Sequence, residues 1–423
     1  MKIKRILSLV LAIALTAVVF VGCNTDSSSE KTDGGEGTAA VEVEKDASLK
    51  VWGPSASVDL IKKQVKAFQD MYPDKNIKIE VVAQEENDAA TNLLNDPTAA
   101  ADVFAFASDQ LSKLTLAKAL LPVYPTYEED IKANHTEAAV ETVKGDFEGK
   151  EVLYAFPETD NGYYLVYDKS VVSDEDAKSW EGVLAACKKA GKKFVMNAGD
   201  GYYSCMFAFT GGLKLDGLAG EAQDEQKFND FNEDDVVASM QAFGQLFADY
   251  KNTFSFASVD KVSAGFKDGT CAAGVDGTWN AAVDQESLGD NYGVVKLPTI
   301  NINGKATDTI GMIGYKYIGV NGQTKYPNAA MEFANFLTGQ DCQQERFDEL
   351  GWTPTHKAVK AEASEGTAAM LEEAKTFVVQ ADIVAAFWTP FGNLGNQLKK
   401  DGAKLDEKSL KELLDKTLAN VNG

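Results

Sequence analysis

Strand and helix patterns alternate along the first part of the chain, and this alternation limits the folds that the chain can adopt. Residues 49–52 predict a strand, residues 58–71 repeat apolar side chains at helical spacing, and residues 77–82 predict a second strand. Residues 101–106 and 111–120 repeat the strand and the helix once more. Such alternation is typical of βαβ units, so we expect an α/β fold with a mostly parallel sheet.

The pattern changes near Gly149, where strand, turn and strand follow one another. Later strands are expected at residues 193–196, 292–297 and 309–319, and later helices at residues 180–190, 205–209, 234–250, 328–337, 343–350, 368–378 and 387–400. A chain of 423 residues is long for a single core, so these elements predict two domains.

The N-terminus has the features of an export signal. Residues 1–5 carry three positive charges, and residues 6–21 are an apolar run without charge or proline. A membrane span usually needs roughly 20 apolar residues, which disfavours a retained span without eliminating it. Gly22 before Cys23 resembles a bacterial lipobox, with Phe20 at the position where leucine is usual. The resemblance implies a lipid on Cys23 and a cell-surface location on the outer face of the cytoplasmic membrane; export without lipid is the alternative.

Charge and composition limit the partners and the chemistry. The net charge of −23 repels nucleic acid and anionic lipid. The cysteines form no C-x-x-C pair, the two histidines form no His-x-x-x-His pattern, and neither a Gly-x-Ser-x-Gly elbow nor a P-loop occurs. We therefore expect no metal and no cofactor. Residues 230–234 are similar to the start of a calcium loop, but the sixth position is Asp235 rather than glycine, which favours a helix cap.

Several stretches resemble, in this order, the extracellular solute-binding proteins of ABC transporters, in the branch that binds maltose and maltodextrins. They are LKVWGPSASVDLIKKQVKAFQDMYP, ADVFAFASDQLSKLTLAKALLPV, GKEVLYAFPETDNGYYLVYDKS, the segment from Gly265 to Trp279, PNAAMEFANFLTGQDCQQERFDELGWTPTH, and AAFWTPFGNLGNQL. The resemblance extends from Leu49 to the C-terminus, and it rests on the ordered series rather than on any single motif.

The resemblance implies a two-lobed fold of the type II periplasmic-binding-protein kind, with a ligand cleft between lobes that close about a hinge. Each lobe is expected to hold a mostly parallel sheet flanked by helices. The expected parts are a signal peptide at 1–22, a flexible linker at 23–46, an N-terminal lobe at 47–159 plus 310–358, and a C-terminal lobe at 160–309 plus 359–423.

The resemblance also implies, position by position, a set of ligand-binding residues. Stacking aromatics are expected at Trp279, Trp388, Tyr202 and Phe106, and hydrogen-bonding groups at Asp109, Asp200, Asn161 and Glu86. Six of them have a structural alternative: core packing for Trp279, Trp388 and Phe106, a helix cap for Asp109, and a solvated turn for Asp200 and Tyr202. Two positions depart from the family, because Asn161 stands where glutamate is frequent and Gln110 where arginine occurs.

These residue types suit an oligosaccharide. Sugar rings stack their C–H faces on aromatic rings, while their hydroxyls need donors and acceptors when they are buried. The hypothesis is a monomeric, non-enzymatic lipoprotein that captures maltodextrin-type sugars and delivers them to an ABC permease. The alternatives are a solute-binding protein for another oligosaccharide or a polyamine, and an extracellular glycoside hydrolase, which needs a pair of carboxyl groups flanking the scissile bond.

Overall fold

The computed structural model of the protein describes residues 41–216, 226–228, 230–361 and 365–422. The expected signal peptide at 1–22, the lipid site at Cys23 and most of the expected linker lie outside the described residues.

Helices and strands alternate along most of the described chain. The strands are β1 (Ser48–Gly53), β2 (Lys78–Ala83), β3 (Val103–Ala107), β4 (Lys144–Phe147), β5 (Lys150–Leu153), β6 (Phe156–Asp168), β7 (Lys193–Val195), β8 (Leu215–Asp216), β9 (Lys227–Phe228), β10 (Phe254–Ser255), β11 (Cys271–Gly277), β12 (Tyr292–Val295), β13 (Ile300–Ile302), β14 (Lys305–Thr307), β15 (Met312–Val320) and β16 (Val378–Val379). The α-helices are α1 (Val58–Met71), α2 (Glu86–Asn95), α3 (Leu111–Leu116), α4 (Pro125–Asn134), α5 (Glu137–Glu141), α6 (Trp180–Ala190), α7 (Gly201–Ser204), α8 (Met206–Phe209), α9 (Glu233–Asp249), α10 (Asp260–Asp268), α11 (Ala281–Leu288), α12 (Pro327–Thr338), α13 (Gln340–Leu350), α14 (Glu365–Glu373), α15 (Trp388–Asp401) and α16 (Glu407–Val421). Short 3-10 turns include η2 (Ser108–Gln110), η4 (Thr278–Asn280) and η6 (Gln380–Asp382).

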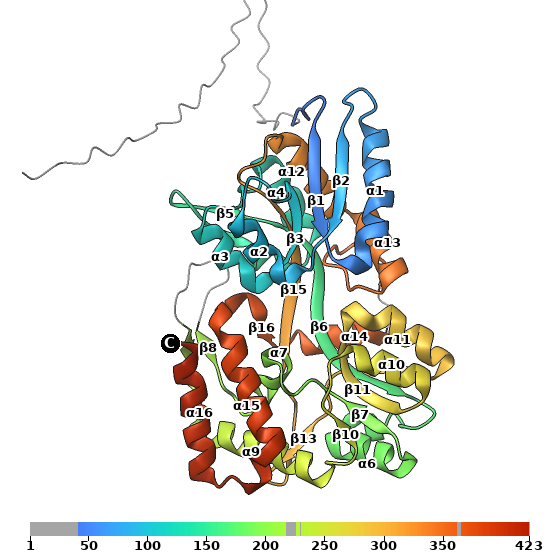
Figure 1. Cartoon of the computed structure of the whole chain (residues 1–423), viewed down its shortest axis with the longest axis vertical. Coiled ribbons are helices and arrows are strands. Elements are labelled where there is room, and N and C mark those ends of the chain that lie inside the picture. The colour runs from blue at the N-terminus through green and yellow to red at the C-terminus, as the bar shows by residue number, and fades with distance from the viewer. Residues whose placement is uncertain (1–40, 217–225, 229, 362–364, 423) are drawn as a thin grey trace, which may run out of the picture. The chain divides into compact units, whose positions relative to one another are not determined.

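The long strands β6 and β15 pair antiparallel at the centre of the fold, and Figure 1 shows both passing from one group of elements into the other. On one side β15 pairs antiparallel with β3, and β3, β1 and β2 continue in parallel. On the other side β6 pairs antiparallel with β11, which runs parallel to β7 and on to β10. The outer strands are parallel, as expected, whereas the two crossing strands join them into one mixed sheet.

Two hydrophobic cores lie on either side of this crossing. One core buries side chains from residues 43–156 and 315–337, and the other from residues 163–313 and 369–421. We call the parts around them the first lobe and the second lobe. Since β6 and β15 contribute side chains to both cores, the crossing strands tie the two lobes together. The described chain is thus an α/β protein with two lobes, as the sequence predicts.

Local sequence explains where several elements end. The prediction for α1 is confirmed, since its buried face repeats apolar residues at helical spacing and Pro73 follows it. Helix α6 ends at Ala190 and is capped by Gly191, whose φ of 69° lies in the left-handed region that glycine tolerates. Helix α3 is shorter than expected and ends at Leu116, because the chain turns at Lys118 with a φ of 52°. Asn232 caps α9 by accepting from the Asp234 N–H, which supports the cap rather than a calcium loop.

The folded part begins before Ala47, where it was expected to begin. Val43 is 3% exposed and packs in the first core. The Glu44 carboxylate accepts hydrogen bonds from the backbone N–H groups of Asn328 and Ala329 at the start of α12. A helix N-terminus offers unpaired N–H groups, so an acidic residue in a polar segment becomes a structural cap there.

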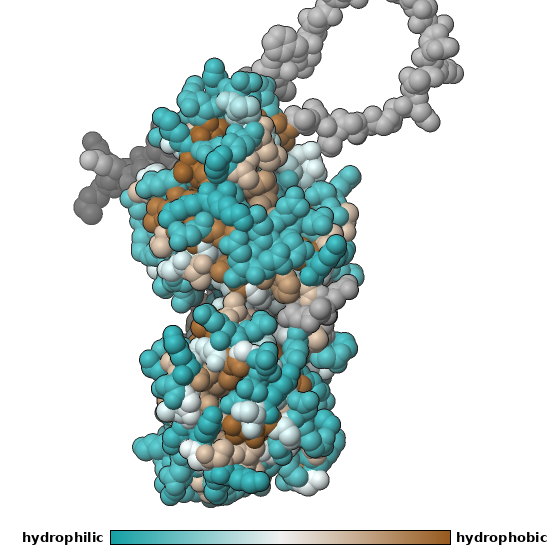
Figure 2. Space-filling model, turned by 90° about the vertical axis from the view of Figure 1, so that its right-hand side faces the viewer, coloured by the Kyte–Doolittle hydropathy of each residue, from teal (hydrophilic) through white to brown (hydrophobic). Residues whose placement is uncertain are grey.

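The face shown in Figure 2 is mostly hydrophilic, with hydrophobic residues in small groups. Such a surface agrees with the net charge of −23. Within the described ranges, no helix is both long enough and apolar enough to cross a membrane.

Candidate functional site

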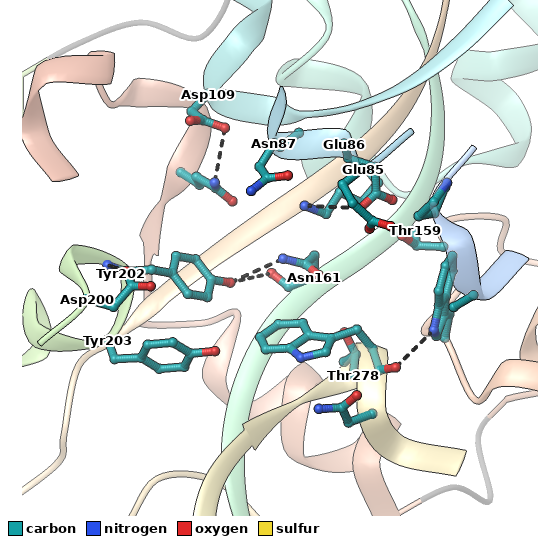
Figure 3. Close-up of a pocket in the computed structure, with 18 of the residues that line it drawn as sticks. Glu85, Glu86, Asn87, Asp109, Thr159, Asn161, Asp200, Tyr202, Tyr203 and Thr278 are labelled. Atoms are coloured by element: carbon teal, nitrogen blue, oxygen red, sulfur yellow. Dashed lines mark hydrogen bonds and ion pairs between the residues drawn. The ribbon is translucent and has the colours of Figure 1, made fainter. Parts of the chain in front are cut away.

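A cavity of about 610 Å³ lies between the two lobes. Residues of the first lobe, among them Glu86 and Asp109, line it together with residues of the second lobe, among them Tyr202, Trp279 and Trp388. Figure 3 shows labelled side chains from both lobes facing one another across this space. The volume falls within the range of about 300–1,000 Å³ that is usual for small-molecule sites.

Three aromatic residues from separate segments meet in the second lobe's wall of the cavity. The ring of Tyr202 lies 6.1 Å from that of Trp279 and 6.2 Å from that of Trp388, measured between centroids, and it is tilted against both. Each of the three is half-buried, with part of its surface open to the cavity. Rings in this state keep apolar faces free for a ligand, which a core aromatic does not.

Glycine residues bring these aromatics into place. A Cβ at Gly277 would lie 2.2 Å from the Trp279 ring, which therefore folds back over the end of β11. A Cβ at Gly201 would lie 2.2 Å from the backbone oxygen of Trp388, so only glycine allows α7 to approach α15 this closely. The position of Trp279 just after an Asp-Gly pair is thus a consequence of close packing at the cavity wall.

Behind Trp279 lies a buried pair of acids. Asp276 and Asp284 are both fully buried, and Asn280 donates to both carboxylate oxygens of Asp276 at 3.0 and 3.2 Å. Ser263 donates to Asp284 at 2.6 Å. Burial raises the pKa of Asp276 well above its usual value, and the charge of Asp284 raises it further. Burial likewise raises the pKa of Asp284 to about 7.

Asp109 links the lobes across the cavity. Asp109 lies in η2, directly after β3. The sequence offered a helix cap as its alternative role, but its side chain makes no capping hydrogen bond here. Its Oδ1 accepts from the Gln380 amide at 3.1 Å, and its Oδ2 accepts from the Trp388 indole N–H at 3.2 Å. Burial raises the pKa of Asp109, and the nearby charge of Lys316 acts in the opposite direction. Both donors come from the second lobe, so the carboxylate holds the cavity wall together.

Asn161 and Asp200 support Tyr202. The Asn161 amide donates to the Tyr202 hydroxyl oxygen at 3.2 Å, and that hydroxyl lies 3.4 Å from the Asn161 backbone oxygen (Figure 3). Asp200 is exposed, lines the cavity and accepts from the Tyr202 N–H at 3.0 Å, which caps α7. Asn161 lies at a position where the solute-binding resemblance predicts glutamate, and here it orients an aromatic residue.

Phe106 is not part of the site. It is fully buried in the first core, where its ring packs edge-on against Tyr317 at 5.5 Å between centroids. The expectation of a cavity aromatic at this position is therefore wrong, because the residue faces inward on β3. Gln110 also has a structural role: it accepts from the Ala90 N–H and donates to the Glu86 backbone oxygen.

Sequence reasoning missed several residues that line the cavity: Glu85, Asn87, Lys316, Gln380 and Tyr203. Trp352, which the sequence left undecided, also lines it, and its indole lies 3.4 Å from the backbone oxygen of Trp279. Lys316 could have been predicted from the sequence, because it is the one charged residue in the apolar strand 312–320. A charge in a buried strand is unusual and indicates a partner or a ligand.

The described residues give little support to a metal site or to a site built on cysteine or histidine. They contain no group of three or more His, Cys, Asp or Glu residues placed to hold a metal ion. The four described cysteines, Cys187, Cys205, Cys271 and Cys342, are free and buried. The two histidines pack against each other at 5.3 Å between ring centroids, in the first lobe, and neither lines the cavity.

A two-lobed α/β fold with an aromatic cavity between the lobes is the architecture of a ligand-capturing binding protein. The sequence profile of bacterial extracellular solute-binding proteins matches residues 63–375, and the chain belongs to this family. No curated protein sequence matches the chain significantly.

Solved structures show the same fold. The maltodextrin-binding protein MalE1 from L. casei BL23, solved without ligand, is 25% identical, with a TM-score of 0.74 over 89% of this chain and 99% of that one. A protein solved with acarbose is 29% identical, with a TM-score of 0.77 over 89% and 99%. The Thermus thermophilus maltotriose-binding protein, bound to maltotriose, is 19% identical, with a TM-score of 0.70 over 88% and 99%. The last of these supports the fold alone.

Proposed function

We propose that the protein captures maltooligosaccharides in the cavity between its lobes and delivers them to an ABC permease. The observation that carries this proposal is the meeting of Tyr202, Trp279 and Trp388 in one wall, opposite the acids of the first lobe. Flat half-buried rings match the C–H faces of sugar rings, and carboxylates accept hydrogen bonds from hydroxyl groups.

The proposed binding set consists of Trp279, Trp388, Tyr202, Asp109, Asp200, Asn161 and Glu86, all of which line the cavity. The maltodextrin-binding and acarbose-bound structures at 25% and 29% identity support a carbohydrate ligand. Binding would draw the lobes together about the crossing strands. The protein would act as a monomer and without catalysis, as a binding protein rather than a hydrolase.

We also propose that residues 1–22 direct export and that Cys23 carries a lipid. The positive N-terminal residues, the apolar run and the small residue before Cys23 support this proposal. A lipid at Cys23 would place the folded part outside the cytoplasmic membrane, beside its permease. Labelling with a radioactive fatty acid tests it, because Cys23→Ser would remove the label.

The experiment that tests sugar binding is a calorimetric titration with maltose, maltotriose and longer maltodextrins, combined with product analysis. Trp279→Ala should weaken maltotriose binding by about 2 kcal/mol or more, as for residues that dominate an interface. Trp180 provides the matched control, since it is fully buried in the second core and donates its indole N–H to Thr309 at 2.9 Å. Trp180→Ala should instead lower the free energy of unfolding by about 3–5 kcal/mol.

Absence of heat with every maltodextrin would remove the glucan proposal. Saturable binding of spermidine in the same cavity would then indicate a polyamine-binding protein. Release of shorter sugars during the titration would indicate a hydrolase.

A further inference from the structure

Lys316 places an ammonium group at the edge of the cavity, on a strand that crosses between the lobes. In β15 it pairs with Thr159 of β6 and Ala107 of β3, while its neighbours Tyr315 and Tyr317 are buried. Successive side chains of a strand point to opposite faces, so Lys316 faces away from the tyrosine side and lines the cavity.

The Lys316 ammonium has an incomplete set of partners. Its Nζ lies 3.8 Å from Oε2 of Glu86, beyond hydrogen-bonding distance, and the side chains of Lys316 and Glu86 are 15% and 14% exposed. Among the described residues, neither the ammonium nor the Glu86 carboxylate makes a side-chain hydrogen bond. An ammonium has three donors and a carboxylate accepts only, so a largely buried pair of this kind leaves both donors and acceptors open.

The Lys316 ammonium and the Glu86 carboxylate are spaced so that one hydroxyl group can bind between them. A hydroxyl oxygen about 2.9 Å from the ammonium and about 2.7 Å from the carboxylate closes a triangle with the 3.8 Å side between them. The oxygen accepts from Lys316 and the hydroxyl hydrogen is donated to Glu86. We propose that Lys316 and Glu86 together bind one hydroxyl group of the ligand and thereby select for a hydroxyl at that position.

The pair discriminates by charge as well as by hydrogen bonding. A ligand ammonium at this position would meet the charge of Lys316, and a ligand carboxylate would meet Glu86. A ligand without a hydroxyl at this position would exclude water from the ion pair without supplying a hydrogen bond to either group, which is costly. Lys316 therefore favours a neutral sugar over a polyamine, and this inference rests on the proposed function.

The test uses maltotriose and a set of its monodeoxy analogues, each lacking one hydroxyl, with affinities measured by calorimetry. For the wild-type protein, one analogue should bind about 10- to 100-fold more weakly than maltotriose, the range expected for losing hydrogen bonds to charged groups. Lys316→Met and Glu86→Gln should weaken maltotriose binding and abolish the discrimination against that same analogue. A residue with a purely structural role would leave this discrimination intact.

Lys192 offers a matched control outside the cavity. It forms an ion pair with Asp168 at 3.4 Å, with side chains 28% and 11% exposed. Lys192→Met should leave both the maltotriose affinity and the discrimination unchanged. Glu86→Gln keeps the shape of its side chain, so it carries the test if Lys316→Met fails to fold.

The outcomes separate the two proposals. If wild-type protein binds no maltodextrin, the proposed function fails and the hydroxyl site fails with it. If maltotriose binds but the variants keep the wild-type discrimination among all analogues, the hydroxyl site alone is overturned.

Discussion

Asp109→Asn tests whether the cavity carboxylate is held by donors from the second lobe. Both oxygens of Asp109 face N–H groups, that of the Gln380 amide at 3.1 Å and that of the Trp388 indole at 3.2 Å. Asparagine keeps the size of the side chain but replaces one oxygen with an NH₂ group. Whichever way the new amide turns, one donor of the second lobe meets another donor.

The expected loss of stability follows from the number of hydrogen bonds that Asp109→Asn removes. One charge-assisted hydrogen bond is replaced by an unpaired donor, and each such loss costs about 1–3 kcal/mol. Asp109 is half-buried, so water relieves part of the penalty. We expect Asp109→Asn to lower the free energy of unfolding by about 1–2 kcal/mol, measured by urea denaturation of the ligand-free protein at pH 7.

Asp200→Asn provides the control, because it removes the same charge from the same cavity. Asp200 caps α7 through one oxygen, at 3.0 Å from the Tyr202 N–H, and asparagine caps a helix equally well. The free energy of unfolding of Asp200→Asn should differ from that of the wild-type protein by no more than about 0.5 kcal/mol. If both variants lose the same free energy of unfolding, the charge in the cavity, rather than the inter-lobe hydrogen bonds, causes the loss. If Asp109→Asn loses none, the hydrogen bonds of Asp109 with Gln380 and Trp388 are refuted.

Two further predictions concern the wall and the floor of the cavity. Gly277→Ala should weaken maltotriose binding and change the tryptophan emission, because its Cβ would lie 2.2 Å from the Trp279 ring and displace it; unchanged emission and affinity would contradict the packing. Burial raises the pKa of Glu86 to about 6 against the lowering effect of Lys316, with Glu158, Glu85 and Arg346 as the other charged groups that act on it. Since the ionised form is lost as pH falls through about 6, maltotriose affinity should fall between pH 7 and pH 5, whereas Glu86→Gln should bind with a flatter pH profile in calorimetry at the same pH values.

The local pattern of the sequence was enough to predict many elements. Helices α1 and α6 have the predicted bounds, since an amphipathic repeat with a proline or glycine after it contains its own stop signal. Helix α16 and the β13–β14 hairpin were missed, as were the antiparallel pairings of β6 and β15. Strand pairing depends on which distant segments meet, and periodicity within a segment carries no such information.

The sequence by itself determined the strand–helix alternation and the apolar faces of the helices. It predicted a turn before Trp279, whereas Asp276 and Gly277 are the last residues of β11 and pair with β6. Tertiary structure alone decided which polar and aromatic residues meet in the cavity. Asp109 bonds to Gln380, 271 positions away in the chain, and Lys316 faces the cavity only because of its register against β6 and β3. Phe106 and Asp109 lie close together in the sequence, yet one is core and the other lines the cavity, because the strand ends between them. The physical reason is that burial and partners are set by long-range packing, whereas propensity acts over a few residues.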